Sequence, residues 1–420
     1  MIVIYTKQVT NRIKYAFDFV FVNYFGIDYE IISDASHSKN ADKFYLSYST
    51  EKTENYFSIF QDELLLEDSI KLQKLFISKE NDIPVFFQTD ENFDIRFDLF
   101  AAIFYLITRY EEYLPHEQDE HGRYKSSNSI LSNAAFNFSP IVEIWLDYFK
   151  QELVKQFPGI IFKNHEFEYQ PTFDIDNAFQ YLGRNWLHKP PNIFNKKCRN
   201  VLLKKEKDAF DTFDFIQQEI ITNQLQPIFF FLMSDEDKHD SNVSPNSTLL
   251  YFQINALSNF QIGIHPSYNT TTFEKIKIET TRLFQILDKP ITLSRQHFLR
   301  LKFPETILNL MQNNIEIDYT LAYPDVIGFR AGYSREINFF DLTKNITTKF
   351  TLQPSSLMDA TFEYYQNNLT NDEILDKFLP FFYLLKKING KLVPIFHNDL
   401  LAIDKYQQFF KSINQLATHK

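Results

Sequence analysis

Short runs of apolar residues alternate with amphipathic segments from about residue 166 onward. The apolar runs are typical of buried strands, and the segments between them place apolar residues at helical spacing. The predicted strands are Phe167–Phe173, Ile228–Met233, Gln261–Ile264, Ile315–Leu321 and Leu392–Phe396. The predicted helices are Ala209–Thr222, Phe273–Leu287, Glu305–Gln312 and Asp372–Ile388. This alternation predicts an α/β fold with a mostly parallel sheet, either open or closed into a distorted (β/α) barrel.

The earlier residues mix short strands with two amphipathic helices, predicted at Phe97–Tyr113 and Pro140–Phe157. Pro115 follows the first helix as a stop signal, and Pro140 suits the first turn of the second. The polar stretch between them, Glu117–Asn133, is expected to be an exposed loop. We therefore predict a smaller α+β amino-terminal domain over residues 1–165 and the α/β domain over residues 166–420, with no low-complexity linker between them.

Composition narrows the possible functions. The chain has 46 Phe and 23 Tyr, which predicts a large aromatic core, and only 8 Gly, with no glycine-rich phosphate motif. A formal net charge of −11 argues against nucleic acid or an anionic membrane as the main partner. Cys198 is the only cysteine, which excludes an internal disulfide and any cysteine-rich metal site.

The amino-terminal residues Met1–Tyr5 resemble a first strand rather than a signal peptide, because basic residues follow closely. No apolar run approaches the roughly 20 residues that a membrane-spanning helix requires. These features predict a soluble, cytoplasmic protein without an integral membrane segment, and nothing in the pattern predicts its oligomeric state.

Polar and titratable side chains follow several of the predicted strands. Asp174 and Asp176 end the first strand of the repeat and share a face if the strand continues through them. Three later groups also follow apolar runs: His265, the Arg295–His297 segment and His397. In folds of this kind, catalytic and ligand-binding residues lie at the carboxyl ends of the strands. A carboxylate and two histidines can hold a divalent metal ion, and the remaining groups can transfer protons.

Each of these residues also has a structural interpretation. The two aspartates can cap backbone amides at a strand end, and a lone histidine is more often a hydrogen-bonded structural residue than a ligand. Asn269 stands four residues after His265, where a second histidine would complete a ligand pair, and an amide oxygen is a poor zinc ligand. His297 is the other candidate for that third position. Their joint placement at strand ends favours a functional site.

Three further residues are candidates from their chemistry. Arg295 can pair with Asp174 and fix its rotamer, although an ordinary surface ion pair is the simpler alternative. Arg330 lies in the glycine-bounded turn Gly328–Gly332 and is a candidate cation for binding substrate. Tyr268 is a candidate aromatic surface for binding substrate. Asp318 and Asp359 are weaker polar candidates than Arg330.

The segment Thr172–Asp176 resembles the first motif, normally T-F-D-D-G, of the polysaccharide deacetylases of carbohydrate esterase family 4, the NodB-type deacetylases. The resemblance extends over roughly residues 166–400, with the motifs in family order. His265 resembles the first histidine of the family's H-[ST]-x-x-H motif, with Asn269 in place of the second. The whole chain resembles a divergent bacterial subgroup with an uncharacterised amino-terminal domain, to which Phe97–Leu114 and His121–Arg123 are similar.

The resemblance implies a distorted (β/α) barrel of about seven strands and a role for each matched residue. Asp174 would be the general base, Arg295 would orient it, and His397 would be the general acid. Asp176 and His265 would bind one divalent metal ion, expected to be zinc, with His297 or Asn269 as the third ligand. The activity implied is removal of N-acetyl groups from an amino-sugar polysaccharide or its precursor. The alternative is a catalytically altered member of the same fold that acts as a carbohydrate-binding module.

Overall fold

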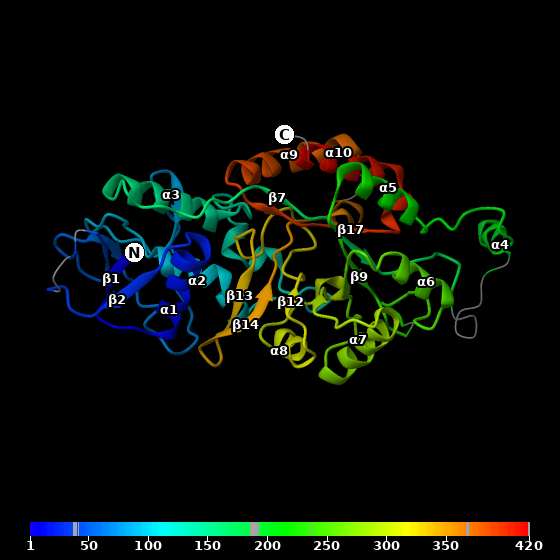
Figure 1. Ribbon diagram of the computed structural model, residues 1–420, viewed down its shortest axis with the longest axis horizontal. Coiled ribbons are helices and arrows are strands. Elements are labelled where there is room, and N and C mark those ends of the chain that lie inside the picture. The colour runs from blue at the N-terminus through cyan, green and yellow to red at the C-terminus, as the bar shows by residue number, and fades with distance from the viewer. Residues whose placement is uncertain are drawn as a thin grey trace.

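The computed structural model describes residues 1–36, 40, 42–184, 192, 194–235, 237–366 and 369–418. Two sheets organise these residues, one in the amino-terminal part and a larger one in the rest of the chain (Figure 1). Within the described ranges, every helix is too short or too polar to cross a lipid bilayer.

The amino-terminal sheet is parallel throughout, with the strand order β2-β1-β3-β4. Its strands are β1 (Ile2–Tyr5), β2 (Tyr29–Ile32), β3 (Phe44–Ser49) and β4 (Phe57–Phe60), and a separate hairpin pairs β5 (Ser78–Glu80) with β6 (Ile83–Val85). The helical segments of this part are α1 (Asn11–Phe17), η1 (Asp18–Tyr24), α2 (Leu99–Ile107), η2 (Tyr110–Tyr113), η3 (Ser126–Asn128), η4 (Ile130–Ser132) and α3 (Ile141–Gln156). Every residue of α2 is buried, so this helix forms the centre of the amino-terminal core.

The larger sheet has nine strands in the order β13-β14-β12-β11-β10-β9-β8-β17-β15, and it curls as a distorted half-barrel. All neighbours are parallel except the antiparallel pair β13 and β14. The strands are β8 (Thr172–Ile175), β9 (Ile228–Phe231), β10 (Gln261–Ile264), β11 (Leu293–Ser294), β12 (Ile317–Asp318), β13 (Ile337–Asp341), β14 (Ile346–Leu352), β15 (Leu357–Met358) and β17 (Pro394–His397). A short pair of β7 (Glu168–Tyr169) and β16 (Lys391–Leu392) lies beside it.

Helices cover both faces of the larger sheet. In Figure 1, α5, α9 and α10 lie above the sheet, α7 and α8 lie below it, and α6 lies to the right of β9. The helical segments are α4 (Lys196–Leu202), α5 (Phe213–Asn223), α6 (Thr248–Ala256), α7 (Phe273–Leu287), η5 (His297–Leu299), α8 (Glu305–Gln312), η6 (Thr361–Tyr365), α9 (Asn371–Lys387), η7 (Leu400–Ala402) and α10 (Asp404–Thr418). Because both faces are covered, a central strand such as β9 is apolar and buried along its whole length.

The two parts of the chain share one continuous hydrophobic core. Tyr15 of α1 packs on Phe340 of β13 with ring centroids 4.9 Å apart, and its hydroxyl donates to the Asn338 carbonyl at 2.7 Å. The hairpin of β13 and β14 therefore joins the larger sheet to the amino-terminal helices. The predicted division at residues 165 and 166 stays a prediction, since a shared core is compatible with one domain or two.

The polar stretch Glu117–Asn133 differs from its expectation as an exposed loop. Gln118 and Tyr124 form an isolated bridge, two short helical turns follow, and Arg123, Tyr124 and Leu131 are buried. The stretch is polar because its side chains bind other parts of the protein, as described below.

Candidate active site

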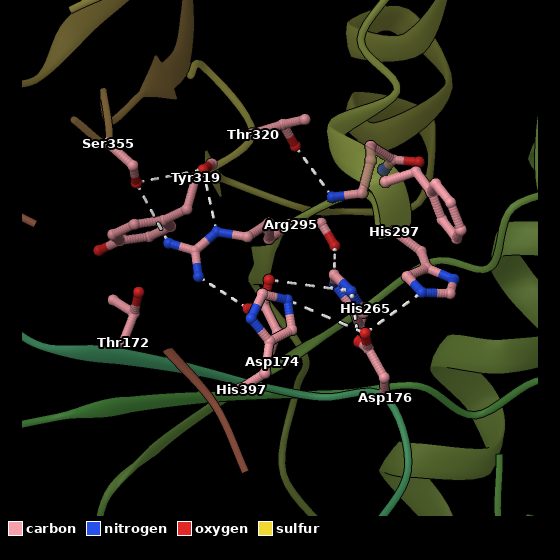
Figure 2. Close-up of polar contacts among 12 residues, drawn as sticks. Thr172, Asp174, Asp176, His265, Arg295, His297, Tyr319, Thr320, Ser355 and His397 are labelled. Atoms are coloured by element: carbon pink, nitrogen blue, oxygen red, sulfur yellow. Dashed lines mark hydrogen bonds and ion pairs between the residues drawn. The ribbon is translucent and has the colours of Figure 1, made fainter. Parts of the chain in front are cut away.

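The polar residues predicted at strand ends meet at one edge of the larger sheet. His397 at the end of β17 pairs in register with Asp174 of β8, and β9 and β10 follow β8 in the sheet. His265 and Arg295 each come directly after a strand, at neighbouring positions of the same edge. Figure 2 shows Asp174, His265 and His397 grouped beside Asp176, with the Arg295 guanidinium group directed toward Asp174 and away from Asp176.

Asp176, His265 and His297 form a cluster that can bind a metal ion. One ligand atom from each residue lies within 4.8 Å of the other two, and among the described residues this is the group that meets that criterion. His265 Nε2 is 3.1 Å from Asp176 Oδ1, and His297 Nε2 is 3.4 Å from Asp176 Oδ2. Bonds of 2.0–2.2 Å in a tetrahedral zinc site place neighbouring ligand atoms roughly 3.3–3.6 Å apart. The two distances between carboxylate and imidazole are therefore close to those in a zinc site.

The second nitrogen of each ligand histidine is engaged. His265 Nδ1 is 2.5 Å from the Arg295 carbonyl oxygen, and His297 Nδ1 is 2.8 Å from Asp240 Oδ1. Both partners accept hydrogen bonds, so Nδ1 carries the proton and Nε2 of the neutral ring is left as an electron-pair donor. The two oxygens of Asp176 face these nitrogens, Oδ1 toward His265 Nε2 and Oδ2 toward His297 Nε2. A carboxylate that faces two donor nitrogens fits a cation at this point.

The charges in the cluster reinforce one another. Burial opposes ionisation of Asp176, but His297 and His265 outweigh it and hold the pKa of this carboxyl well below its usual range. Burial also opposes the charged form of His297, whereas Asp176 and Asp240 raise its pKa to about 9. When no metal is bound, the protonated His297 ring therefore supplies positive charge beside Asp176.

Asp174 is fixed by Arg295, as the sequence led us to expect. Arg295 Nη1 donates to Asp174 Oδ1 at 2.7 Å, and both side chains are buried. The guanidinium group also donates to the Tyr319 carbonyl and to Ser355 Oγ, and it lies 4.6 Å from the centre of the Phe230 ring. With Oδ1 engaged, Asp174 Oδ2 is 3.9 Å from His265 Nε2. Asp174 thus borders the metal-binding cluster without being one of its three members.

His397 lies beside Asp174 at the edge of the sheet and is held by Asp359. Its Nδ1 is 2.6 Å from Asp359 Oδ1, its backbone N–H donates to Asp359 Oδ2 at 2.8 Å, and its Nε2 is 3.9 Å from Asp176 Oδ2. Burial lowers the pKa of His397, but Asp359, Asp176 and Asp174 together raise it well above its usual value. The imidazole is therefore a protonated group that faces the cluster.

These groups lie in a cavity of about 540 Å³. This volume is within the range of about 300–1,000 Å³ that is usual for small-molecule sites. The lining residues are Glu120, His121, Arg123, Asp174, Asp176, Asn177, His239, Ser241, His265, Gln296, His297, Phe298, Leu299, Met358, Tyr364, Tyr365, His397 and Asp399. The first three belong to the amino-terminal part of the chain, so both parts contribute to the wall.

Asn269 and Arg330 lie away from the cluster. Asn269 is exposed, and its Nδ2 donates to Asp237 Oδ2 at 2.5 Å. Arg330 is buried, pairs with Glu112 and is not among the residues that line the cavity. The expectation that Arg330 contacts substrate is therefore corrected. Its glycine-bounded turn serves packing, because a Cβ at Gly328 would meet the Phe138 backbone.

Tyr268 supports the wall of the cavity from behind. Its ring stacks on His239 with centroids 4.1 Å apart, and its hydroxyl is 3.3 Å from His121 Nδ1. Tyr268 is not itself among the lining residues. Its predicted contact with substrate stays a prediction.

Asp240 and His121 were not predicted from the sequence as site residues, and Asp359 was predicted only as a weaker candidate. Asp240 lies in a loop, and no residue spacing in the sequence connects it to His297. Its carboxylate also accepts a hydrogen bond from the Tyr268 backbone N–H at 2.9 Å. The one signal for His121 was the His121–Arg123 segment, which carried no chemistry by itself.

Comparisons with known proteins give one family match and several similar solved structures. Residues 2–158 match the family model described as "Family of unknown function (DUF7033)". A comparison with curated protein sequences gives no match. Among solved structures, a protein of Mycobacterium smegmatis described as a polysaccharide deacetylase is 12% identical, with a TM-score of 0.41 over 61% of this chain and 86% of that chain. The Puue allantoinase is 13% identical, with a TM-score of 0.40 over 59% of this chain and 84% of that chain.

Proposed function

We propose that the protein is a metal-dependent hydrolase that removes N-acetyl groups from an amino-sugar polysaccharide or its precursor. The observation that carries this proposal is the convergence of Asp176, His265 and His297 beside Asp174 and His397. A metal site flanked by one carboxylate and one imidazolium provides a base and an acid for hydrolysis of an amide. The motifs that resemble the NodB-type deacetylases supply the same residues in the same roles.

Asp176, His265 and His297 would hold one divalent cation, and zinc is the metal that a set of two imidazoles and one carboxylate suits best. When bound, such a cation polarises an amide carbonyl and makes water acidic enough to lose a proton near neutral pH. Asp240 and the Arg295 carbonyl keep the two imidazoles oriented for binding.

Asp174 accepts the proton from the attacking water. Arg295 occupies Oδ1, so Oδ2 is the oxygen that faces the cluster and takes the proton. The same hydrogen bond fixes the rotamer of Asp174, so that Oδ2 stays directed toward the cluster.

His397 donates a proton to the departing amine nitrogen. Its Nε2 faces the cluster, and its Nδ1 is held by Asp359, as a general acid requires. The base and the acid lie in register on neighbouring strands, and both border the metal-binding residues.

The alternative, a carbohydrate-binding module that has lost its metal site, predicts ligand atoms that do not converge. The spacing of the three ligand atoms favours the hydrolase, since His297 occupies the position that Asn269 leaves unfilled.

The first test is the metal content of the purified protein, measured by mass spectrometry after growth with zinc and after supply of cobalt. We expect one equivalent per chain in the wild type and in Asn269→Ala, and loss of metal in His297→Ala, because only His297 belongs to the cluster. Absence of metal from every preparation would reject the hydrolase and favour the binding module.

The second test is release of acetate from N-acetylated chitooligosaccharides by Asp174→Asn beside the wild type. We expect turnover to fall by about 10²- to 10⁴-fold, the range for loss of a general base, with metal content retained. Loss of metal in this variant would show instead that Asp174, and not Asp176, is the carboxylate ligand.

A further inference from the structure

The cavity has a second end, which a loop of the amino-terminal part builds. The loop runs from Asp119 to Tyr124, and its Glu120, His121 and Arg123 line the cavity together with residues of the larger sheet. It lies inside the segment that matches the family of unknown function. A segment that resembles no catalytic motif therefore contributes directly to the space in front of the candidate metal site.

Arg123 holds this loop against residues of the carboxyl-terminal part of the chain. Its Nε donates to Asp119 Oδ2 at 2.7 Å, its Nη1 to the Phe298 carbonyl at 2.9 Å, and its Nη2 to the Tyr365 hydroxyl at 2.9 Å. From the other side, Arg300 Nε donates to the His121 carbonyl at 2.9 Å. These bonds fix the backbone of the loop, so the His121 ring has a defined place in the wall.

Aromatic and imidazole rings surround that place. The His121 ring is 4.8 Å from Phe298 and 6.1 Å from His239 between centroids. On the π-helix η6, Tyr364 and Tyr365 also line the cavity and are 65% and 40% exposed. Flat rings with polar edges are the surfaces that bind sugars, because the ring faces cover C–H groups and the edges bind hydroxyls.

The charges at the loop end of the cavity favour an uncharged sugar ring at that end. Arg123 is the one Lys or Arg among the described lining residues, and each of its nitrogens already donates to a protein acceptor. Carboxylates are present at both ends, including the exposed Glu120 and the half-buried Asp399. At the end of the cavity formed by the loop, away from His397 and the metal-binding cluster, a carboxylate or phosphate on the ligand would meet Glu120 without a free Lys or Arg to bind it.

We propose that the loop Asp119–Tyr124 forms a binding subsite for a neutral sugar ring, next to the ring that carries the reacting acetamide. This inference rests on the proposed function, since it names the neighbouring sugar of the same substrate. It assigns the amino-terminal part a task in substrate binding, with His121 as the residue that contacts the sugar and Arg123 as the positioning residue.

The test compares His121→Ala with the wild type on tri-N-acetylchitotriose, by acetate release and by calorimetric binding. We expect KM and Kd to rise about tenfold or more, with kcat changed much less, because His121 contacts none of the residues that hold or transfer protons. The matched control is His165→Ala, a half-buried histidine that lies outside this cavity and whose Nε2 is 2.8 Å from the Tyr24 carbonyl oxygen. It should behave as the wild type does.

A second ligand tests the charge. The same trisaccharide with its reducing end oxidised to a carboxylate should bind the wild type more weakly than the neutral form. Equal or tighter binding of the acidic form would overturn the preference for a neutral sugar. An unchanged KM and Kd in His121→Ala, with active wild type, would overturn the subsite while the proposed function stands.

The two proposals can fail separately. If the wild type releases no acetate but binds the trisaccharide, and His121→Ala weakens that binding, the subsite is supported and the hydrolase is rejected. If the wild type neither binds nor hydrolyses the trisaccharide, both are overturned. Metal content measured on each variant shows whether the candidate metal site is intact in every comparison.

Discussion

His265, His297 and His397 each present Nε2 to the cavity because Nδ1 is held by an acceptor. The acceptors come from three separate places in the chain: the Arg295 carbonyl, Asp240 and Asp359. A ring that is held at one nitrogen loses little freedom when the other binds a metal or a substrate. Removing Asp240 or Asp359, the carboxylates that hold two of these rings, should therefore impair metal binding or catalysis nearly as much as removing the rings.

For Asp240→Asn we expect metal affinity to fall by about 10- to 100-fold, the usual effect of removing a carboxylate that orients a histidine ligand. The amide keeps the size of the side chain but removes the charge that favours the Nδ1–H form of His297. Competition with a chromogenic zinc chelator measures the change. Asp237→Asn is the control, because Asp237 is an exposed residue of the same loop that bonds to Asn269. Equal affinity in the two variants would contradict the role of Asp240.

For Asp359→Asn we expect catalysis to be impaired and metal binding to be retained. Metal content should be retained, because Asp359 bonds to His397, which is outside the metal-binding cluster. The kcat for acetate release should fall by about 100-fold, the lower end of the range for general acid catalysis. A variant that loses its metal, or one with unchanged kcat, would show that His397 is not the proton donor.

The strand-end residues of the site could be predicted because each follows an apolar run of its own and parallel strands end at one edge. Asp240 could not, since it lies in an irregular loop whose path depends on tertiary packing. The sequence also left the third ligand open between His297 and Asn269. A helical spacing from His265 would be needed to bring Asn269 back to the site, but the chain after His265 turns outward and leaves Asn269 exposed.

Among the elements, β10 determines where His265 lies, and Gly263 allows β10 to approach its neighbours. A Cβ at this position would be 2.7 Å from the Phe230 ring and 2.8 Å from the Leu293 carbonyl oxygen. The Leu293 oxygen belongs to the backbone of β11 and cannot turn away. We expect Gly263→Ala to cost about 1–3 kcal/mol of unfolding free energy, as overpacking of a core does, and to weaken metal binding by moving His265.

Urea unfolding and metal titration on Gly263→Ala check both effects. The control is Gly159→Ala, where no atom lies within 4 Å of the added Cβ and stability should change little. A Gly263→Ala protein as stable as the wild type would mean that β10 and β11 can separate without loss.

Several elements appear where periodicity predicted them. The helices α7 and α8 and the strand β10 have the predicted bounds, because their apolar residues repeat clearly and turn residues flank them. The hairpin of β13 and β14 was not predicted. Residues of β14 are mostly polar and exposed at the start and buried only toward the end, so the two-residue alternation of a strand is weak there. Its packing against the amino-terminal helices depends on residues hundreds of positions away.

At the scale of the whole molecule, buried polar contacts join the two parts of the chain. Glu143 of α3 accepts hydrogen bonds from the backbone N–H and the hydroxyl of Ser334, at 2.7 Å and 2.5 Å. Burial raises the pKa of Glu143 to about 7, although the bonds from Ser334 oppose this effect. Its second oxygen is buried without a partner. The junction therefore contains a carboxyl group that is neutral in the folded protein under mildly acidic conditions.

Stability should fall as the pH rises between the ordinary pKa of a glutamate and 7. In this window the folded protein keeps the Glu143 proton, which the unfolded chain has already released, so raising the pH favours unfolding. The loss reaches about 3 kcal/mol near pH 7 and is constant above it. In Glu143→Gln this slope should disappear from urea unfolding measured between pH 5 and pH 8. Glu152→Gln, on the same helix and paired with Lys155, should keep it.

The order of strands in the larger sheet also sets the order in which it can be completed during synthesis. β8 leaves the ribosome early, yet one of its two neighbours, β17, comes more than two hundred residues later. Until then, β8 presents an unpaired edge of hydrogen-bonding groups, which invites pairing with other chains. A growing chain that already contains Asp176, His265 and His297 still lacks the strand that closes this edge and carries His397. The edge of β8 is therefore closed only when the last strand of the sheet has been made.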